Sequence, residues 1–487
     1  MMPPSESRSG SSAPPLVVDL DGTVTPTDTL WESLVRLVQE RPSYLLRLPF
    51  WLLHGRAGFK ACLARSIRWS GEGIPLNDEF ISYLRDQKAA QRKIILATAA
   101  NIRIAETVAK RIGVFDAVIA SDDRVNVKAG KKLDAIRAHV GERFVYAGDD
   151  KADLPIWSAA GRSILVGGSA SLRRKVARSS LLEREFQSAG AGLALWLRAV
   201  RAHQWLKNLL VFVPVLTSFS FSDGARLGAA VLAFVAFCMA ASATYLINDL
   251  WDLDNDRAHP RKRARPLASG SIGIGHAIGA STALLLAASV AAVTVGLRFA
   301  LVLFAYFVLA SAYSWFLKRF IIADVLTLAC LYTTRVLAGA VAIEVPVSSW
   351  LLAFSVFLFF SLALVKRCAE LVTMEQIGRP GAGGRNYVVS DLKVLWPMGV
   401  GASLCSVVVF GLFISAPDTA VRYASPQLIW LVALGLIYWL ARIWIKTTRG
   451  EMHDDPVVFA IRDGTSRITI LLMVLIAILA HFAKLEL

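Results

Sequence analysis

Residues 204–487 are dominated by apolar stretches long enough to cross a membrane, and no other feature constrains the fold as much. A transmembrane helix needs about 20 mostly apolar residues to cross a hydrocarbon core about 30 Å thick. We therefore predict an all-α polytopic membrane domain. Its nine candidate spans lie near residues 208–222, 228–250, 275–295, 298–315, 322–343, 348–365, 395–415, 427–446 and 467–484. The first span is the shortest and contains Pro214.

The basic residues of this half indicate how it is oriented. They concentrate in the loops of one side, beginning after the second span with Arg257, Arg261, Lys262, Arg263 and Arg265. Because cytoplasmic loops carry an excess of Lys and Arg, we expect these loops and the N-terminal domain in the cytoplasm, at the inner membrane. Topology and anionic lipid substrates explain the net charge of +16. A nucleic-acid partner is therefore not expected.

The N-terminal half has the composition of a soluble domain. We predict an α/β domain over residues 15–185, a disordered Ser- and Pro-rich leader over 1–14, and a linker over 186–203. The five cysteines lie far apart and form no C-x-x-C pair. Neither a disulfide framework nor a zinc site is expected, and the thiols should be reduced.

An acidic motif follows the second predicted span. Residues 248–256 read N-D-x-x-D-x-x-x-D. If the helix continues through them, Asp249, Asp252 and Asp256 share one face, whereas Asp254 points elsewhere. Carboxylates in this arrangement suit Mg²⁺ that shares its ligands with substrate phosphates. The alternative is a solvated acidic helix end.

This motif and the following R-x-R-P-L-x-S-G (263–270), within a series of membrane helices, resemble the UbiA superfamily of intramembrane prenyltransferases. The resemblance implies that the three aspartates are catalytic and hold Mg²⁺ and a pyrophosphate. It also implies that Asn248 and Arg265 bind substrate. The second acidic motif of the family is depleted here, because Asp324 is the only acid near Tyr313–Lys318.

Two further segments, 201–208 and 362–371, resemble the branch of the family that makes polyprenyl-phosphate phosphoribose. This resemblance implies a polyprenyl phosphate acceptor and phosphoribosyl pyrophosphate as donor. The cations expected to bind their phosphates are Lys207, Lys318, Arg335, Lys366 and Arg367. Positive-inside topology is the alternative explanation for these cations.

Two other functions remain open from the sequence. One is an aromatic prenyltransferase of the same fold that uses a polyprenyl pyrophosphate, and the depleted second acidic motif argues against it. The other is a transporter or lipid carrier with a regulatory soluble domain. The acidic motif argues against this function, because a carrier does not need a cluster of three carboxylates for Mg²⁺.

The soluble half carries four motifs in a fixed order. A short apolar run ends in D-x-D-G-T with Asp19 and Asp21, and a second run, 93–98, ends at Thr98. Lys132 follows, and a last run ends in G-D-x-x-x-D with Asp149 and Asp153. Together they resemble the haloacid dehalogenase superfamily, which implies a Rossmann-like sheet with a helical cap.

The resemblance also implies the roles of these residues. Asp19 would be the nucleophile and Asp21 the general acid and base. Thr98 and Lys132 would hold the phosphoryl oxygens, and Asp19, Asp21, Asp149 and Asp153 would form a Mg²⁺ site. The expected reaction is removal of a phosphate, such as the 5-phosphate of the lipid product. A catalytically silent domain kept for assembly is the alternative.

Residues 28–90 occupy the position of the cap. Within them, residues 44–54 are very apolar for a soluble surface. We expect this segment to rest on the membrane interface, with packing inside the domain as the alternative.

Overall fold

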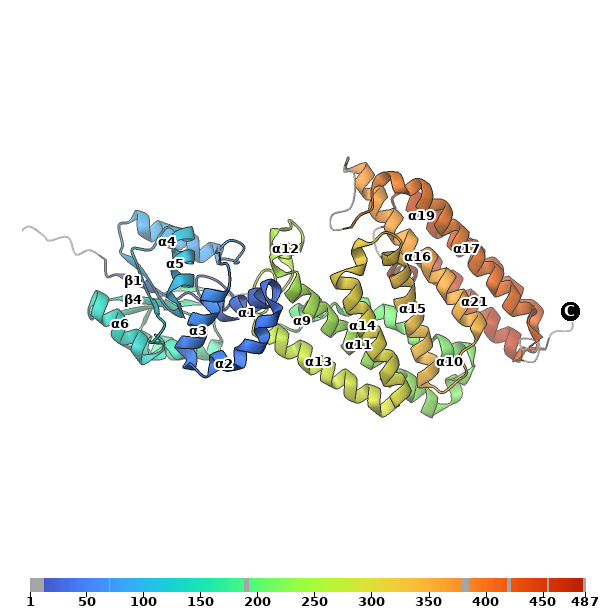
Figure 1. Cartoon of the computed structure of the whole chain (residues 1–487), viewed down its shortest axis with the longest axis horizontal. Helices are drawn as coiled ribbons and strands as arrows, with labels where there is room; N and C mark the ends of the chain where they lie inside the picture. Colours follow the sequence, from blue (N-terminus) through green and yellow to red (C-terminus); the bar gives the residue numbers. More distant parts are fainter. Residues whose placement is uncertain are drawn as a thin grey trace, which may run out of the picture. The chain divides into compact units, whose positions relative to one another are not determined.

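The computed structural model describes residues 13–69, 71–187, 192–378, 385–417, 422–452 and 455–484 (Figure 1). Most of the predicted leader (1–12) and part of the predicted linker (188–191) lie outside the described residues. The chain divides into two compact units. One contains residues 1–199 and 246–280, and the other contains residues 200–245 and 281–487.

The N-terminal domain is built on a six-stranded sheet in which every pairing is parallel. Its strands, in the order β3-β2-β1-β4-β5-β6, are β3 (Ala117–Ser121), β2 (Ile94–Asn101), β1 (Leu16–Val18), β4 (Val145–Gly148), β5 (Arg162–Val166) and β6 (Leu181–Phe186). The predicted α/β class is therefore confirmed. Because the chain leaves the central strand β1 toward both edges, the carboxyl ends of β1 and β4 form the switch point where such sheets bind ligands.

Helices cover both faces of this sheet. Leu16 and Val18 of β1 join one buried apolar cluster, while Val17 joins the opposite cluster with Tyr146 and Trp157. This alternation is the two-residue period of a strand buried on both faces. The helices are α4 (Asp78–Ala89), α5 (Ile102–Ile112), α6 (Gly130–Val140), η2 (Lys151–Asp153), α7 (Leu154–Ala159) and α8 (Ala170–Ser179), followed by α9 (Leu193–Ala199).

A helical insertion separates β1 from α4. It contains α1 (Thr29–Glu40), η1 (Pro42–Arg47), α2 (Leu48–Leu52) and α3 (Gly55–Ser66). Its apolar segment has two faces. Tyr44, Leu48 and Trp51 pack inside the insertion against Leu37 and Leu63. The other face exposes large apolar side chains, including Leu45, Leu46, Phe50, Leu52 and Leu53.

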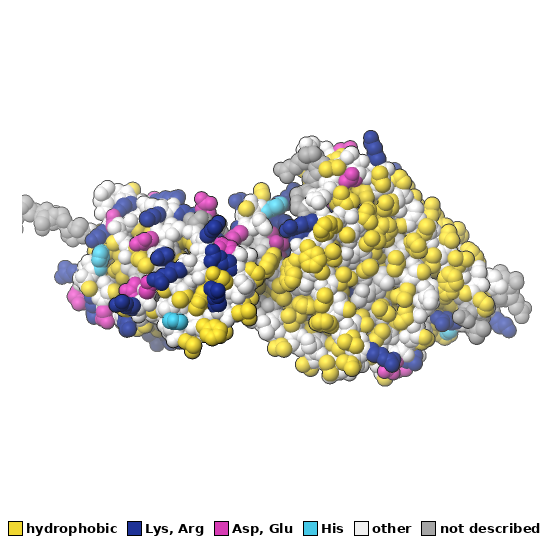
Figure 2. Space-filling model, viewed as in Figure 1, with side chains coloured by type: hydrophobic (Ala, Val, Ile, Leu, Met, Phe, Trp, Pro, Cys, Tyr) yellow, Lys and Arg dark blue, Asp and Glu magenta, His cyan; other side chains and the backbone are white. Residues whose placement is uncertain are grey.

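Eight helices of the described residues are long and apolar enough to cross a membrane. They are α11 (Gly224–Trp251), α13 (Ile274–Val295), α14 (Leu297–Trp315), α15 (Ala323–Ala342), α16 (Ser349–Gln376), α17 (Leu392–Ser415), α19 (Ile429–Thr448) and α21 (Gly464–Phe482). Short elements join them: η4 (Ser220–Ser222), α12 (Leu253–Ala258), η5 (Lys262–Ala264), η6 (Leu317–Arg319), η7 (Val389–Asp391), η8 (Pro426–Leu428) and α20 (Pro456–Arg462). Figure 2 shows hydrophobic side chains across the visible face of this helical part.

The first predicted span, 208–222, is not among these eight helices of the described residues, so the ninth predicted span is not confirmed. The chain there forms a 3-10 helix, η3 (Ala202–Phe212), and the short helix α10 (Val213–Thr217). Pro214 starts α10, and close packing fixes η3, because a Cβ on Gly339 of α15 would lie 2.0 Å from the Val211 carbonyl oxygen. Since a 3-10 helix rises about 2.0 Å per residue, η3 and α10 together reach about 30 Å, the thickness of the hydrocarbon core.

Candidate functional site

Three carboxylates meet at the switch point of the sheet. Asp19 follows β1 directly, and its backbone N–H donates to the carbonyl of Ala147 in β4 at 2.9 Å. Oxygens of Asp19, Asp149 and Asp153 all lie within 4.8 Å of one another. No other group of metal-ligating side chains comes this close together in the described part of the chain.

Two glycines bring the backbone close to these carboxylates. Gly22 has a φ of +77°, and a Cβ there would lie 1.9 Å from Asp149 Oδ2. A Cβ on Gly148 would lie 2.6 Å from Asp153 Oδ2. Both positions of the sequence motifs D-x-D-G-T and G-D-x-x-x-D therefore require glycine, in the first case for the left-handed conformation as well.

The cluster fits a divalent cation. Asp153 Oδ2 is buried and accepts no hydrogen bond from the described residues. Burial and the charges of Asp19 and Asp153 raise the pKa of Asp149 to about 8, and burial with the charge of Asp19 raises the pKa of Asp153 to about 6. Carboxylates crowded in this way bind a cation in place of protons, because a cation removes their mutual repulsion.

Lys132 and Thr98, which the sequence predicts to hold phosphoryl oxygens, line the same cavity as the cluster. Lys132 Nζ is 2.9 Å from Asp19 Oδ1 and 3.5 Å from Asp153 Oδ1, and it donates to the Tyr146 hydroxyl at 2.7 Å. Burial opposes the charged form of Lys132, but these two carboxylates prevail and raise its pKa. Thr98 is fully buried in β2, and its hydroxyl accepts the backbone N–H of Ala100.

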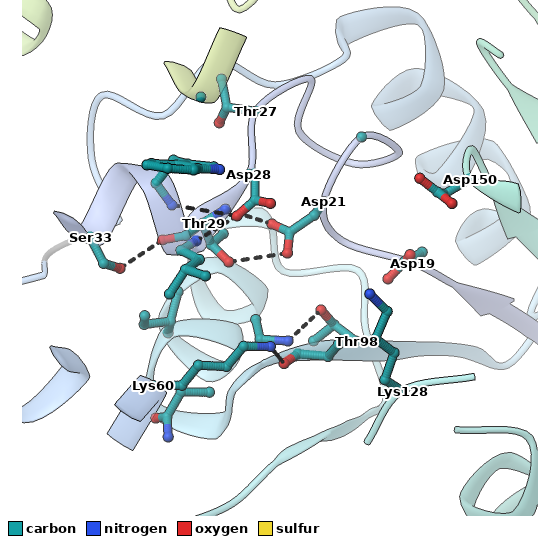
Figure 3. Close-up of a pocket in the computed structure, with 18 of the residues that line it drawn as sticks. Asp19, Asp21, Thr27, Asp28, Thr29, Ser33, Lys60, Thr98, Lys128 and Asp150 are labelled. Carbon is teal, nitrogen blue, oxygen red and sulfur yellow. Dashed lines mark hydrogen bonds between the residues drawn. The ribbon is translucent and has the colours of Figure 1, made fainter. Parts of the chain in front are cut away.

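Asp21 is turned away from the three-carboxylate cluster. Its carboxylate accepts the backbone N–H of Thr29 at 2.8 Å and the Thr29 hydroxyl at 3.2 Å, and Figure 3 shows it directed toward α1. Burial and the charge of Asp28 raise the pKa of Asp21 to about 7. Such a carboxyl can both give and take a proton near neutral pH, which is the requirement for general acid and base catalysis.

These residues line a cavity of about 1080 Å³. The insertion contributes Trp31 and Lys60 to its wall, and residues 273–276, at the start of α13, contribute another part. Sequence reasoning missed Lys60, whose ammonium donates to the Ala99 carbonyl at 2.6 Å (Figure 3). Burial lowers its pKa. Nothing in the sequence around Lys60 marks it, because it comes from a helix outside the four motifs.

The acidic motif after α11 departs from the expected continuous helix. α11 ends at Trp251, Asp252 interrupts the helical pattern, and α12 begins at Leu253. Asp249 and Asp256 are nevertheless both buried and converge on one guanidinium. Arg265 Nη1 lies 3.2 Å from Asp249 Oδ1 and 2.5 Å from Asp256 Oδ2. Asp254 is exposed and does not join them.

This arrangement also fits a cation, because two buried carboxylates converge on Arg265, and Lys262 Nζ lies 3.8 Å from one of them, Asp256 Oδ1. Asp252 is half-buried at the helix break, and within the described residues it does not complete a tight three-carboxylate group with the other two. Asn248 lies in the last turn of α11. Arg265, expected to bind phosphate, here neutralises the two carboxylates.

Two of the predicted cations meet in the membrane unit. Lys207 Nζ of η3 and Lys366 Nζ of α16 lie 2.8 Å and 3.1 Å from the same oxygen, Asp455 Oδ2. The Tyr332 hydroxyl donates to Asp455 as well. Sequence reasoning missed Asp455, although an acid directly before Pro456 and an apolar helix is a recognisable helix start.

The other predicted cations have different surroundings. Arg335 is buried and donates to Asn208, Tyr306 and the Leu331 carbonyl. Arg367 is fully buried, with Nη2 2.6 Å from Asp324 Oδ2, and it also pairs with Glu370. Lys318 lies in η6. Asp324 is thus bound to Arg367, which explains why the lone acid of the second motif can remain buried.

The model of the UbiA prenyltransferase family matches residues 211–462, more than half of the chain. The chain belongs to this family. The UbiA domain is accordingly the helical membrane part, and the protein is an integral membrane transferase.

Relatives of this UbiA protein differ in how much of it they share. An uncharacterized protein of Sinorhizobium fredii is 36% identical over 455 residues, which are 93% of this chain and 88% of that protein. The decaprenyl-phosphate phosphoribosyltransferase of Mycolicibacterium smegmatis is 35% identical and covers 56% of this chain and 88% of its own length. Among solved structures, a UbiA homologue from Archaeoglobus fulgidus has a TM-score of 0.45 and 18% identity, covering 59% of this chain and 99% of that one.

Proposed function

We propose that the UbiA domain transfers the 5-phosphoribosyl group of phosphoribosyl pyrophosphate to a polyprenyl phosphate. The observation that carries this proposal is the meeting of Lys207 and Lys366 at Asp455. Two ammonium groups share one carboxylate, so the group keeps a net positive charge that suits a phosphate. The similarity to the decaprenyl-phosphate phosphoribosyltransferase supports the same assignment.

On the donor side, Asp249, Asp252 and Asp256 would hold Mg²⁺, which supplies charge neutralisation for the departing pyrophosphate. Arg265 already contacts two of these acids and would be released toward a phosphate oxygen when the metal binds. Asn248, one residue before Asp249, would orient the donor.

On the acceptor side, Lys207 and Lys366 would hold the lipid phosphate. An oxygen of that phosphate attacks the anomeric carbon of the ribose, and the bond from that carbon to the pyrophosphate oxygen breaks. The nucleophile is already an anion, so the protein does not have to remove a proton. Positioning of two anions by fixed cations is the main contribution of these side chains.

We further propose that the N-terminal domain is a haloacid dehalogenase-like phosphatase that removes the 5-phosphate of this product at the cytoplasmic face. An oxygen of Asp19 would attack phosphorus, and the bond to the sugar oxygen would break as Asp21 gives that oxygen its proton. Water would then attack the phosphorus and give a proton to Asp21, and the bond between phosphorus and the Asp19 oxygen would break, which releases phosphate and restores the Asp19 carboxylate. Mg²⁺ on Asp19, Asp149 and Asp153 would neutralise the phosphoryl charge.

One experiment tests both proposals. The purified full-length protein is incubated with Mg²⁺, phosphoribosyl pyrophosphate and a polyprenyl phosphate, and the lipids are identified by mass spectrometry. We expect polyprenyl-phosphoryl ribose from the wild type and its 5-phosphorylated form from Asp19→Asn. A parallel reaction contains a polyprenyl pyrophosphate and an aromatic acid. If a product formed only in that parallel reaction, the protein would be an aromatic prenyltransferase and our proposal would be wrong.

A further inference from the structure

Helix α1 of the N-terminal domain carries a stripe of polar side chains. Glu32, Arg36 and Gln39 are spaced four and three residues apart, so they lie on one face of the helix. All three contact residues 250–257, the segment that contains the interruption between α11 and α12. We call these three residues the α1 stripe.

The strongest contact of the α1 stripe is a buried ion pair. Arg257 Nη2 lies 2.6 Å from Glu32 Oε1, and Arg257 Nη1 lies 2.9 Å from Glu32 Oε2. Only 1% of the Glu32 side chain and 5% of the Arg257 side chain are exposed. Arg257 also donates from Nε to the Ala268 carbonyl. The Arg257 guanidinium therefore connects three segments. It follows the acidic motif, binds the Ala268 carbonyl of the basic segment, and forms two parallel hydrogen bonds with Glu32 of α1.

The other two residues of the stripe act on the helix break itself. Gln39 donates its side-chain amide to the carbonyls of Leu250 and Trp251, at 3.3 Å and 2.8 Å. These carbonyls belong to the last two residues of α11, directly before the interruption at Asp252. Arg36 lies 3.2 Å from Asp254.

Two glycines after the acidic segment approach α1 and the loop before it. A Cβ on Gly270 would lie 2.7 Å from Pro26 Cγ, and a Cβ on Gly275 would lie 2.8 Å from the Trp31 ring. The N-terminal domain is thus packed closely against residues 250–275 at several points, and the α1 stripe is the polar part of this packing.

We infer that the α1 stripe positions the acidic motif of the transferase. Arg257 directly follows Asp256, whose carboxylate shares Arg265 with Asp249. A shift of Arg257 therefore moves one of the two converging carboxylates. Gln39 stabilises the interruption at Asp252, which lies between the two converging aspartates, Asp249 and Asp256. The inference rests on the proposed role of these aspartates, and it gives the N-terminal domain a second task that is independent of phosphatase chemistry.

The test compares Glu32→Gln with the wild type in the full-length protein. Because loss of a supporting partner typically lowers metal affinity or activity about 10- to 100-fold, we expect the Mg²⁺ concentration for half-maximal transfer to rise by about tenfold or more. Hydrolysis of p-nitrophenyl phosphate should be unchanged, which shows that the N-terminal domain remains folded. The reversed pair Glu32→Arg with Arg257→Glu should recover part of the transfer rate.

A matched control lies on the same helix. Glu40 accepts the backbone N–H of Arg68, and within the described residues it forms no hydrogen bond or ion pair with the acidic segment, so Glu40→Gln should leave the Mg²⁺ requirement unchanged. Gln39→Ala is the second variant, since it removes only the contact with the two carbonyls. It should raise the Mg²⁺ requirement in the same direction as Glu32→Gln, by a smaller factor.

A second measurement does not depend on the reaction. Hydrogen–deuterium exchange of residues 250–258 should become faster in Glu32→Gln and in Gln39→Ala, and should not change in Glu40→Gln. If the wild type makes no phosphoribosylated lipid, the proposed function fails, and the exchange data still test the inference. Unchanged exchange and an unchanged Mg²⁺ requirement in both stripe variants would overturn it.

Discussion

The two acidic groups of this protein are assembled in different ways. In the N-terminal domain, Asp19 and Asp149 stand at the ends of adjacent parallel strands, so the topology of the sheet brings them together. After α11, Asp249 and Asp256 converge across an interrupted helix and are held by Arg265 and, through Arg257, by α1. The first group is placed mainly by the ends of two adjacent strands, with Asp153 added from η2, whereas the second depends on side chains from several distant segments.

The largest expected effect is on phosphate release, which should depend on the first acidic group and not on the second. Asp19→Asn should lower phosphate release about 10⁴-fold or more, because it removes the covalent route, and it should leave transfer unchanged. Phosphate release and the mass of the lipid product measure both steps. If transfer fell together with phosphate release, the two groups would not act independently.

The next effect concerns the acidic motif. Asp249→Ala and Asp256→Ala should each lower the initial rate of pyrophosphate release about 10²- to 10³-fold, because each removes a carboxylate that neutralises the leaving group. Asp254→Ala should change the rate by no more than about threefold, since its exposed carboxylate pairs with Arg36 and, at 3.9 Å, with Arg257, and does not converge with Asp249 and Asp256 on Arg265. An equal loss in Asp254→Ala would contradict the geometry of two converging buried acids.

Two adjacent residues of α16, Lys366 and Arg367, should have different roles, one in substrate binding and the other in stability. Arg367→Ala should lower the free energy of unfolding by about 3–5 kcal/mol, because the buried Asp324 loses its 2.6 Å ion pair and keeps the Tyr387 hydroxyl and the more distant Arg385, at 3.9 Å. Lys366, with 31% of its side chain exposed, should tolerate alanine with little loss of stability. Lys366→Ala should instead raise the KM for polyprenyl phosphate about tenfold. Thermal unfolding and initial rates distinguish the two residues.

The smallest expected effect concerns the insertion. Leu46 and Leu53 are 78% and 83% exposed, so Leu46→Glu and Leu53→Glu should spare the core of the domain. If this face rests on the membrane, each variant should lower dephosphorylation of the lipid product about threefold and spare p-nitrophenyl phosphate. Leu181→Glu, at a similarly exposed position on β6, is the control. Equal rates on both substrates in all variants would favour packing as the only role of the segment.

The sequence predicted the first group better than the second for a physical reason. Strand ends in a parallel sheet meet at one edge, so the order of the motifs predicts that Asp19, Thr98 and Asp149 lie near one another. Lys132 and Asp153 come from the helical elements α6 and η2. The turn of Asp21 toward Thr29 depends on the first turn of α1 and was not predictable from the motif.

In the membrane half, hydropathy and motif spacing did not predict the features that depend on contacts between distant segments. Hydropathy found the eight regular spans but not the 3-10 helix η3, because its conformation depends on contacts with α15. The helix break at Asp252 was missed for the same reason, since Gln39 lies more than 200 residues away in the sequence. Asp455 joins Lys207 and Lys366 only through the folded arrangement of the helices.

The contacts of the α1 stripe have a consequence for how this gene can change. The Mycolicibacterium smegmatis relative matches only 56% of this chain, so a similar transferase half also occurs in a differently built protein. Exchange of the N-terminal half between relatives would bring a foreign α1 against residues 250–257. Substitutions at Glu32 and Gln39 should therefore be inherited together with changes at Arg257 and the end of α11. Recombination between the two halves should preserve the transferase only where the α1 stripe and residues 250–257 come from the same parent protein.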